Sequence, residues 1–176
     1  MAFKLSRFTI LYGCYIILSA AFMQQLRSAL IDSVGEEVVR MAFKVFCAFL
    51  FLAVTAWAIR KNLSFVRTGT LLLLFALAFF LMSRQPYFSE KTHVITYGFL
   101  GFLACRDYLK SSTKKWTAFF VLCLFVTTIS AADELFQRFL PYRVGDLRDV
   151  LTNVLAGFLG ILIGCTVTFR NRSRKT

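Results

Sequence analysis

The sequence has few charged residues and a single histidine, and it lacks the common catalytic motifs. Charged residues make up 17% of the 176 positions and hydrophobic residues 58%, whereas a soluble domain has about a quarter charged residues. No HExxH, GxSxG or Walker motif occurs, so the sequence supplies no familiar metalloprotease, hydrolase or nucleotide-binding signature. Together with a mean hydropathy of +0.67, this composition excludes a soluble domain and predicts a polytopic membrane protein.

Cysteine is also used sparingly. The five cysteines form no CxxC motif, their number is odd, and each lies within an apolar segment. They are therefore predicted to act as small hydrophobic side chains rather than as disulfide partners or zinc ligands. The residues concerned are Cys14, Cys47, Cys105, Cys123 and Cys165.

Basic residues outnumber acidic ones, 21 against 9, which gives a net charge of +12. In a soluble chain this excess would suggest nucleic acid as a partner. Here the basic residues lie between and beside apolar runs, where lipid headgroups and topology signals account for them. The predicted partner is the lipid bilayer, and no nucleic-acid binding is expected.

The apolar runs predict an all-α fold, a single domain (1–176) forming a polytopic membrane bundle of about six hydrophobic helices. A helix needs about 20 apolar residues to cross a bilayer. The fourth run is short and contains Gly98 and Gly101, so it is predicted to lie in the interior of the bundle. The six runs are Phe8–Leu30, Val38–Ile59, Phe65–Ser83, Thr92–Cys105 (92–105), Trp116–Ala132 and Val150–Phe169.

The first run has an alternative interpretation as a signal peptide, because Ser19-Ala20-Ala21 is a tolerable cleavage site. The apolar pattern continues past that point through Phe22 and Leu26. This continuation favours a retained membrane span.

Six spans place both termini on the same side of the membrane. With the N-terminus inside, thirteen of the 21 Lys and Arg fall on the cytoplasmic side, including the basic tail at 170–176, with Asp107 as the only acid there. The positive-inside rule therefore predicts a multi-pass protein of the cytoplasmic membrane with both termini cytoplasmic.

Polar residues gather at the start of the fourth span, at the end of the fifth and at the start of the sixth. This polar cluster is predicted to face the extracytoplasmic side. His93 and Tyr97 are four residues apart at the start of the fourth span, as are Asp133 and Gln137 at the end of the fifth, so each pair shares a helix face. Further polar residues follow in the same part of the chain. They are Glu134, Arg138, Tyr142, Arg143, Asp146, Arg148, Asp149 and Asn153.

Each of these features also has a purely structural interpretation. A lone His93 is typical of a hydrogen-bonded bundle residue. Glu134 with Arg138 would make an ordinary helical ion pair, and the Gly157, Gly160 and Gly164 stripe is typical of close helix packing. The convergence of one histidine, several carboxylates, an asparagine and arginine at one membrane face favours a functional site.

Two segments resemble the VanZ-like family, which is named for a teicoplanin-resistance protein. The first is Glu90-Lys91-x-His93-x-x-x-Tyr97. The second and stronger is Asp133-Glu134-x-x-Gln137-x-x-x-Pro141-x-Arg143, followed by Asp149-x-x-x-Asn153 and Gly160. The resemblance covers about residues 84–164.

Three positions depart from the family pattern: Glu90 replaces Asp, Tyr142 replaces the Gly of Pro-Gly-Arg, and Ala156 replaces a Gly after the Asn. The resemblance implies a small bacterial membrane protein of the cell envelope, with reduced susceptibility to teicoplanin-type glycopeptides in some members. It does not supply a biochemical activity.

We consider three classes of function for the cluster. In a membrane enzyme acting on a lipid-linked envelope precursor, Glu134 or Asp133 would be the general base or acid, because a carboxylate at a partly dehydrated helix end can keep its proton near neutral pH. His93 would be the second acid or base of the reaction. In a non-catalytic protein the same site would bind a glycopeptide antibiotic or a cell-wall precursor, and in a transporter it would relay protons.

The candidate catalytic residues are thus Glu134, His93 and Asp133. A divalent metal held by His93, Glu134 and Asp149 is conceivable, but one histidine with scattered carboxylates is weak evidence, and no metal or cofactor is predicted. The candidate substrate-binding residues are Lys91, Tyr97, Gln137, Arg138, Arg143, Asp149 and Asn153.

Overall fold

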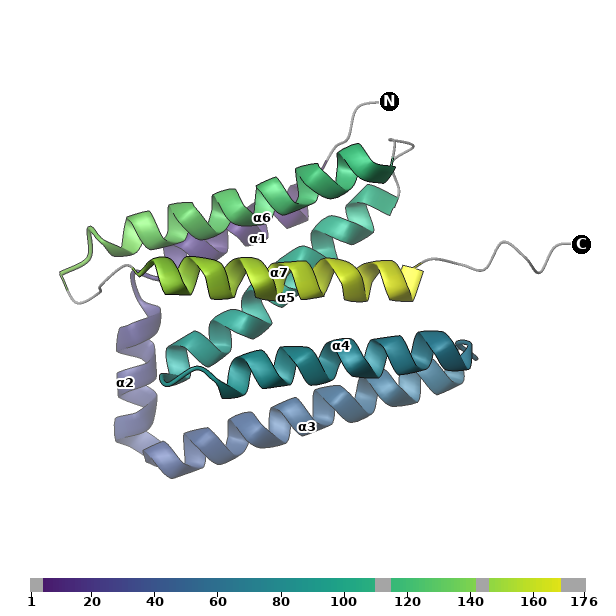
Figure 1. The fold of residues 1–176 in the computed structure, drawn as a ribbon. Coiled ribbons are helices and arrows are strands. Elements are labelled where there is room, and N and C mark those ends of the chain that lie inside the picture. Colours follow the sequence, from purple (N-terminus) through teal and green to yellow (C-terminus); the bar gives the residue numbers. More distant parts are fainter. Residues whose placement is uncertain (1–4, 110–114, 142–145, 169–176) are drawn as a thin grey trace, which may run out of the picture.

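A computed structural model describes residues 5–109, 115–141 and 146–168, and within these ranges every regular element is a helix (Figure 1). The all-α prediction is therefore confirmed. The predicted basic tail at 170–176 and the residues Tyr142 and Arg143 lie outside the described residues. The helices are α1 (Arg7–Ser19), α2 (Met23–Val34), α3 (Glu36–Arg60), α4 (Phe65–Ser83), α5 (Phe88–Leu109), α6 (Lys115–Gln137) and α7 (Leu147–Thr168).

The helices alternate in direction along one main axis. In Figure 1, α3, α5 and α7 run one way and α1, α4 and α6 run the other, while α2 lies across one end. We call the end that carries α2, the start of α5, the end of α6 and the start of α7 the distal end. The opposite, proximal end carries both the start of α1 and the end of α7, as the prediction of termini on one side requires.

The first predicted span is not one straight helix. It is broken after Ser19, and α1 and α2 meet at an angle of 66°. Gln24, Gln25 and Arg27 follow the break, and such polar side chains are costly in hydrocarbon. No residue of α2 is buried, and α2 mixes polar with apolar side chains, as helices that lie along a membrane surface do.

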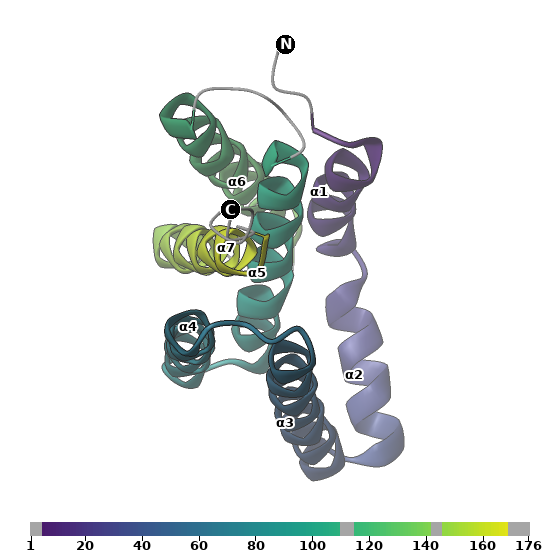
Figure 2. The same cartoon turned by 90° about the vertical axis from the view of Figure 1, so that its right-hand side faces the viewer.

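The fourth predicted span is longer than expected. The prediction of a fourteen-residue segment at 92–105 was wrong, because α5 has 22 residues, which at about 1.5 Å per residue is enough to cross a bilayer. Its charged ends, such as Glu90 and Arg106, hid its length in the hydropathy pattern. The interior position was predicted correctly: α5 contacts α1, α4, α6 and α7 (Figure 2), and Tyr97 and Leu100 are fully buried.

Four helices, namely α3, α4, α6 and α7, are long and apolar enough to cross a membrane, and the bent α1–α2 pair makes a fifth candidate. The helix α3 buries only Val39 and Ala58, and apolar side chains such as Phe49 are 69% exposed. Exposed apolar area on this scale is typical of a lipid-facing surface. The structure is that of a helical membrane bundle.

Glycines bring α5 and α7 into backbone contact. A Cβ atom on Gly101 would collide with the carbonyl group of Gly157, and a Cβ atom on Gly160 would collide with the carbonyl group of Gly98. The close packing predicted for the glycine stripe of the last helix is therefore confirmed, and the helix that packs against it is α5. Such small-residue contacts let membrane helices pack without a hydrophobic driving force.

The proximal end holds a buried acid that the sequence pattern assigned to a loop. Asp107 is 5% exposed, and its Oδ2 accepts hydrogen bonds from the Thr9 hydroxyl at 2.5 Å and the Ser6 backbone N–H at 2.8 Å. It thereby satisfies donors at the start of α1. Deeper in the same half, the Sγ atoms of Cys105 and Cys165 lie 3.2 Å apart, and both cysteines are free thiols.

The α5–α7 contact predicts unequal effects of two glycine substitutions. Gly160→Ala should lower the free energy of unfolding by about 1–3 kcal/mol, because the new methyl group meets backbone that cannot move aside. Gly69→Ala is the matched control, since no atom lies within 4 Å of its Cβ position in α4. Unfolding in detergent, followed by circular dichroism, measures both; equal stabilities of the two variants would contradict the packing described.

Candidate functional site

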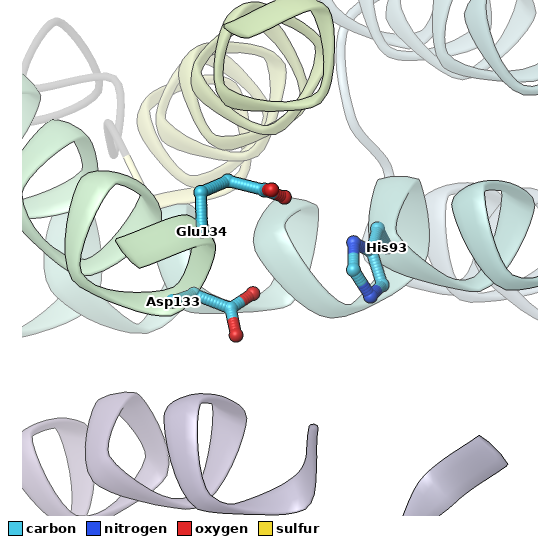
Figure 3. Close-up of side chains that lie close together, drawn as sticks. All are labelled: His93, Asp133 and Glu134. Carbon is cyan, nitrogen blue, oxygen red and sulfur yellow. The ribbon is translucent and has the colours of Figure 1, made fainter. Parts of the chain in front are cut away.

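Three chemically active side chains meet at the distal end of the bundle. His93 lies in the second turn of α5, and Asp133 and Glu134 lie in the last turns of α6; one ligand atom from each lies within 4.8 Å of the others (Figure 3). Asp133 is 1% exposed and Glu134 is 4% exposed, while His93 is half-buried. The structure thus brings together the three residues predicted as catalytic.

Asp133 and Glu134 are adjacent in sequence, and both are buried because α6 is covered on several sides. Neighbouring helix residues point about 100° apart, so a single packing partner could not cover both. The helix α6 contacts α1, α5 and α7. The buried arc of α6 is therefore wide enough to take in both carboxylates.

Tyr97 joins the fourth span to this cluster. It lies one turn after His93, its ring centroid is 6.1 Å from that of His93, and its hydroxyl donates a hydrogen bond to Asp133 Oδ2 at 2.9 Å. Because Tyr97 is fully buried, this bond forms away from water and fixes the orientation of the carboxylate. The prediction that His93 and Tyr97 share a face is confirmed.

Glu134 is tied to the beginning of α7. Its Oε2 accepts a hydrogen bond from the backbone N–H of Asp146 at 3.2 Å. Asp146 in turn accepts a hydrogen bond through Oδ1 from the backbone N–H of Arg148 at 2.9 Å, which caps the helix. A helix N-terminus favours a nearby negative charge, so the environment of Glu134 differs from that of Asp133.

Two amide side chains of α6 and α7 are also buried. Gln137 is 3% exposed and lies one turn beyond Asp133 on α6, and Asn153 is 1% exposed on α7. The side-chain nitrogen of each has no hydrogen-bond partner among the described residues. A buried donor without a partner costs about 1–3 kcal/mol, which indicates that these two nitrogens are available to a ligand or to water.

The rim of the site is more open to solvent. Arg148 forms a salt bridge with Glu90 at 3.2 Å, and the side chain of Arg148 is 55% exposed. Asp149 and Lys91 are half-buried, and Asp149 lies close enough to Glu90 for the two carboxylates to repel each other. The Arg148–Glu90 salt bridge links α7 with α5 at this end of the bundle.

Arg138 is exposed, in contrast to the buried Asp133 and Glu134. The helix α6 ends at Gln137, and a turn follows in which Phe139 N–H bonds to Phe136 O and Leu140 N–H to Gln137 O. Past a helix end, four-residue spacing no longer predicts direction, and Arg138 is exposed. Arg143, the other arginine among the predicted substrate-binding residues, lies outside the described residues.

Sequence reasoning missed Ser130. It is fully buried, lies one turn before Asp133 and Glu134, and its hydroxyl donates to the carbonyl oxygen of Val150 on α7 at 3.3 Å. Its three-residue spacing from Asp133 was the available signal. A serine inside an apolar span is otherwise unremarkable, because it can bond to its own helix.

The fold and the site together define a helical membrane protein with a buried His–Asp–Glu cluster at one end of its bundle. A family model described as VanZ/LLP1 matches residues 7–168. The chain therefore belongs to the VanZ/LLP1 family, as the resemblance at 84–164 predicted, and the match extends over nearly the whole chain. Comparisons with curated proteins and with solved structures gave no match.

Proposed function

We propose that this protein acts at the extracytoplasmic face of the bacterial cytoplasmic membrane, where its polar cluster lowers susceptibility to teicoplanin-type glycopeptides. The observation that carries the proposal is the convergence of His93, Asp133 and Glu134 within 4.8 Å. Desolvated ionisable groups reduce the stability of a membrane protein, so they are rare there and usually mark functional sites. Their assembly from two helices therefore supports a site rather than incidental polarity.

The surroundings of the cluster suit an amphiphilic ligand. Apolar side chains at the distal end are strongly exposed: Leu135 is 57%, Phe139 76%, Leu147 75% and Tyr87 65% exposed. The same end of the bundle carries the charged pair Glu90 and Arg148. A molecule with an acyl chain and a polar head would find both kinds of contact at this end, as would a glycopeptide with a lipid tail or a lipid-linked precursor.

An enzyme acting on a lipid-linked envelope precursor is the second candidate. General acid–base catalysis requires groups in different environments, so that one gives up a proton while the other takes it. The two carboxylates meet this condition, because Asp133 accepts from Tyr97 and Glu134 accepts from the start of α7. Proton-coupled transport has less support, since buried Leu100, Leu103 and Ala104 separate the cluster from the proximal end.

The orientation of the bundle rests on its charges. The proximal end carries the loop between α3 and α4 with Arg60, Lys61 and Arg67, and basic loops stay in the cytoplasm. The distal end then faces outward. It carries most of the acids, including Asp133, Glu134 and Asp146.

Alkaline phosphatase fusions test this orientation, because the enzyme is active only outside the cytoplasm. Fusion after Gln85, at the end of α4, should give high activity. Fusions after Asn62, between α3 and α4, and after Thr176 should give almost none, while green fluorescent protein after Thr176 should fluoresce. The reverse pattern would place the cluster on the cytoplasmic side and contradict the proposal.

Teicoplanin susceptibility tests the function. Expression of the wild-type chain in a sensitive host should raise the inhibitory concentration severalfold. The variants Glu134→Gln and His93→Gln should return it to the vector level, because they keep size and hydrogen bonding but remove the charge or the imidazole. Glu37→Gln is the matched control, since Glu37 is exposed at the start of α3, and it should protect like wild type.

Membrane abundance of every variant is measured alongside. Equally abundant variants that protect as well as wild type would show that the cluster is structural. A wild-type chain that gives no protection would refute the antibiotic-related function.

A further inference from the structure

The cluster has the geometry of a metal site. The three ligand atoms lie within 4.8 Å of one another, so an ion at their centre lies at most about 2.8 Å from each, whereas zinc bonds to nitrogen and oxygen are about 2.0–2.2 Å. Side-chain shifts of well under 1 Å would close that difference. The separations among the ligand atoms of His93, Asp133 and Glu134 are thus within reach of one shared ion.

The donor set indicates which ion fits. One imidazole nitrogen and two carboxylate oxygens suit Zn²⁺, and also Mn²⁺, whereas the imidazole disfavours Mg²⁺ and Ca²⁺. A divalent ion attracts ionised carboxylates such as those of Asp133 and Glu134. Buried carboxylates are stable where such a charge is supplied.

The neighbouring hydrogen bonds support the same assignment. Ligands of metal ions are oriented by outer partners, and both carboxylates have one. Tyr97 donates to Asp133 Oδ2 at 2.9 Å, and the Asp146 backbone N–H donates to Glu134 Oε2 at 3.2 Å. Each carboxylate has two oxygens, so one can accept this bond while the other binds the ion.

The buried amides give an independent indication of a ligand. Three protein ligands leave a zinc ion at least one open position, which water or a substrate oxygen fills. The side-chain nitrogens of Gln137 and Asn153 are buried donors that lack partners among the described residues. Donors of this kind match an oxygen on a metal ion, either water or an oxyanion such as a phosphate.

We propose that His93, Asp133 and Glu134 bind one divalent transition-metal ion, with Zn²⁺ as the best fit, and that Gln137 and Asn153 hold an oxygen ligand beside it. The site coincides with that of the proposed function, but metal binding is measured without reference to antibiotic protection. Asp149, which the sequence suggested as a ligand in place of Asp133, belongs to the rim.

Metal content of the purified protein tests the proposal. The chain, carried by an affinity tag without histidine, is stripped with chelator in detergent, equilibrated with ZnCl₂ or MnCl₂ and desalted. Elemental analysis should find about one zinc per chain. His93→Gln, Asp133→Asn and Glu134→Gln should each lower the zinc affinity at least tenfold, and Tyr97→Phe should lower it about 10- to 100-fold through the lost outer hydrogen bond.

Three control variants test for other zinc ligands, and a thermal measurement on the wild-type chain guards against misfolding. Asp32→Asn and Glu37→Gln remove exposed carboxylates and should bind zinc like wild type. Cys105→Ala removes one of the paired thiols and should also bind like wild type. The wild-type chain itself should unfold at a higher temperature with ZnCl₂ than with chelator, which needs no variant.

X-ray absorption of the zinc-loaded wild type should show nitrogen and oxygen ligands only. Each of three results would overturn the metal site. The wild-type protein could contain no zinc, the three ligand variants could bind zinc as tightly as wild type, or zinc binding could depend on Cys105. Loss of antibiotic protection in His93→Gln and Glu134→Gln alongside a metal-free wild type would retain the proposed function and refute the metal. Zinc binding by a wild-type chain that gives no antibiotic protection would retain the metal site and refute the proposed function.

Discussion

The contact between the glycine faces of α5 and α7 is the constraint on which the rest of the structure depends. Gly101 meets the backbone of Gly157, and Gly160 meets that of Gly98, so two helix axes approach more closely than side chains would permit. The helix α6 packs against both. Once α5 is fixed on α7, His93 and Tyr97 lie within reach of the carboxylates of α6, and the start of α7 lies beside Glu134.

The two ends of the bundle hold buried acids in contrasting ways. At the proximal end, Asp107 has a clear structural task, since Ser6 and Thr9 at the start of α1 donate to it. At the distal end, two carboxylates and an imidazole meet, and the nearby amides of Gln137 and Asn153 retain donors without partners among the described residues. The hydrogen bonds from the start of α1 give Asp107 a structural role, whereas the buried amide donors of Gln137 and Asn153 mark the distal end as a candidate site.

Much of the fold could be predicted from sequence, because its determinants are local. Apolar runs mark helices, the glycines of the last span mark close packing, and four-residue spacing places His93 with Tyr97. The full length of α5 was missed, because polar residues at helix ends weaken the hydropathy signal without ending the helix. The bend after Ser19 was missed because the apolar pattern continues across it. The exposure of Arg138 goes with its place just after the end of α6, and residue spacing alone does not contain that information.

The site was predicted as a set of residues but not as a geometry. Sequence reasoning grouped His93, Asp133 and Glu134 by their chemistry and their membrane face, and it could not tell Asp133 from Asp149 as their third member. That choice is made by packing between helices far apart in the chain. The same limit explains why Ser130, whose partner is the carbonyl of Val150 on α7, was overlooked.

The most direct test of the account asks whether the fourth and fifth predicted spans meet at these residues in a native membrane. In a cysteine-free background with a protease site between Leu109 and Lys115, the pair H93C and E134C is treated with a short thiol-reactive cross-linker and then cleaved. The account predicts that the two fragments stay joined. The pair H93C and L135C, with Leu135 on the exposed side of α6, should separate. Equal cross-linking of both pairs, or none in either, would contradict the convergence of His93 and Glu134.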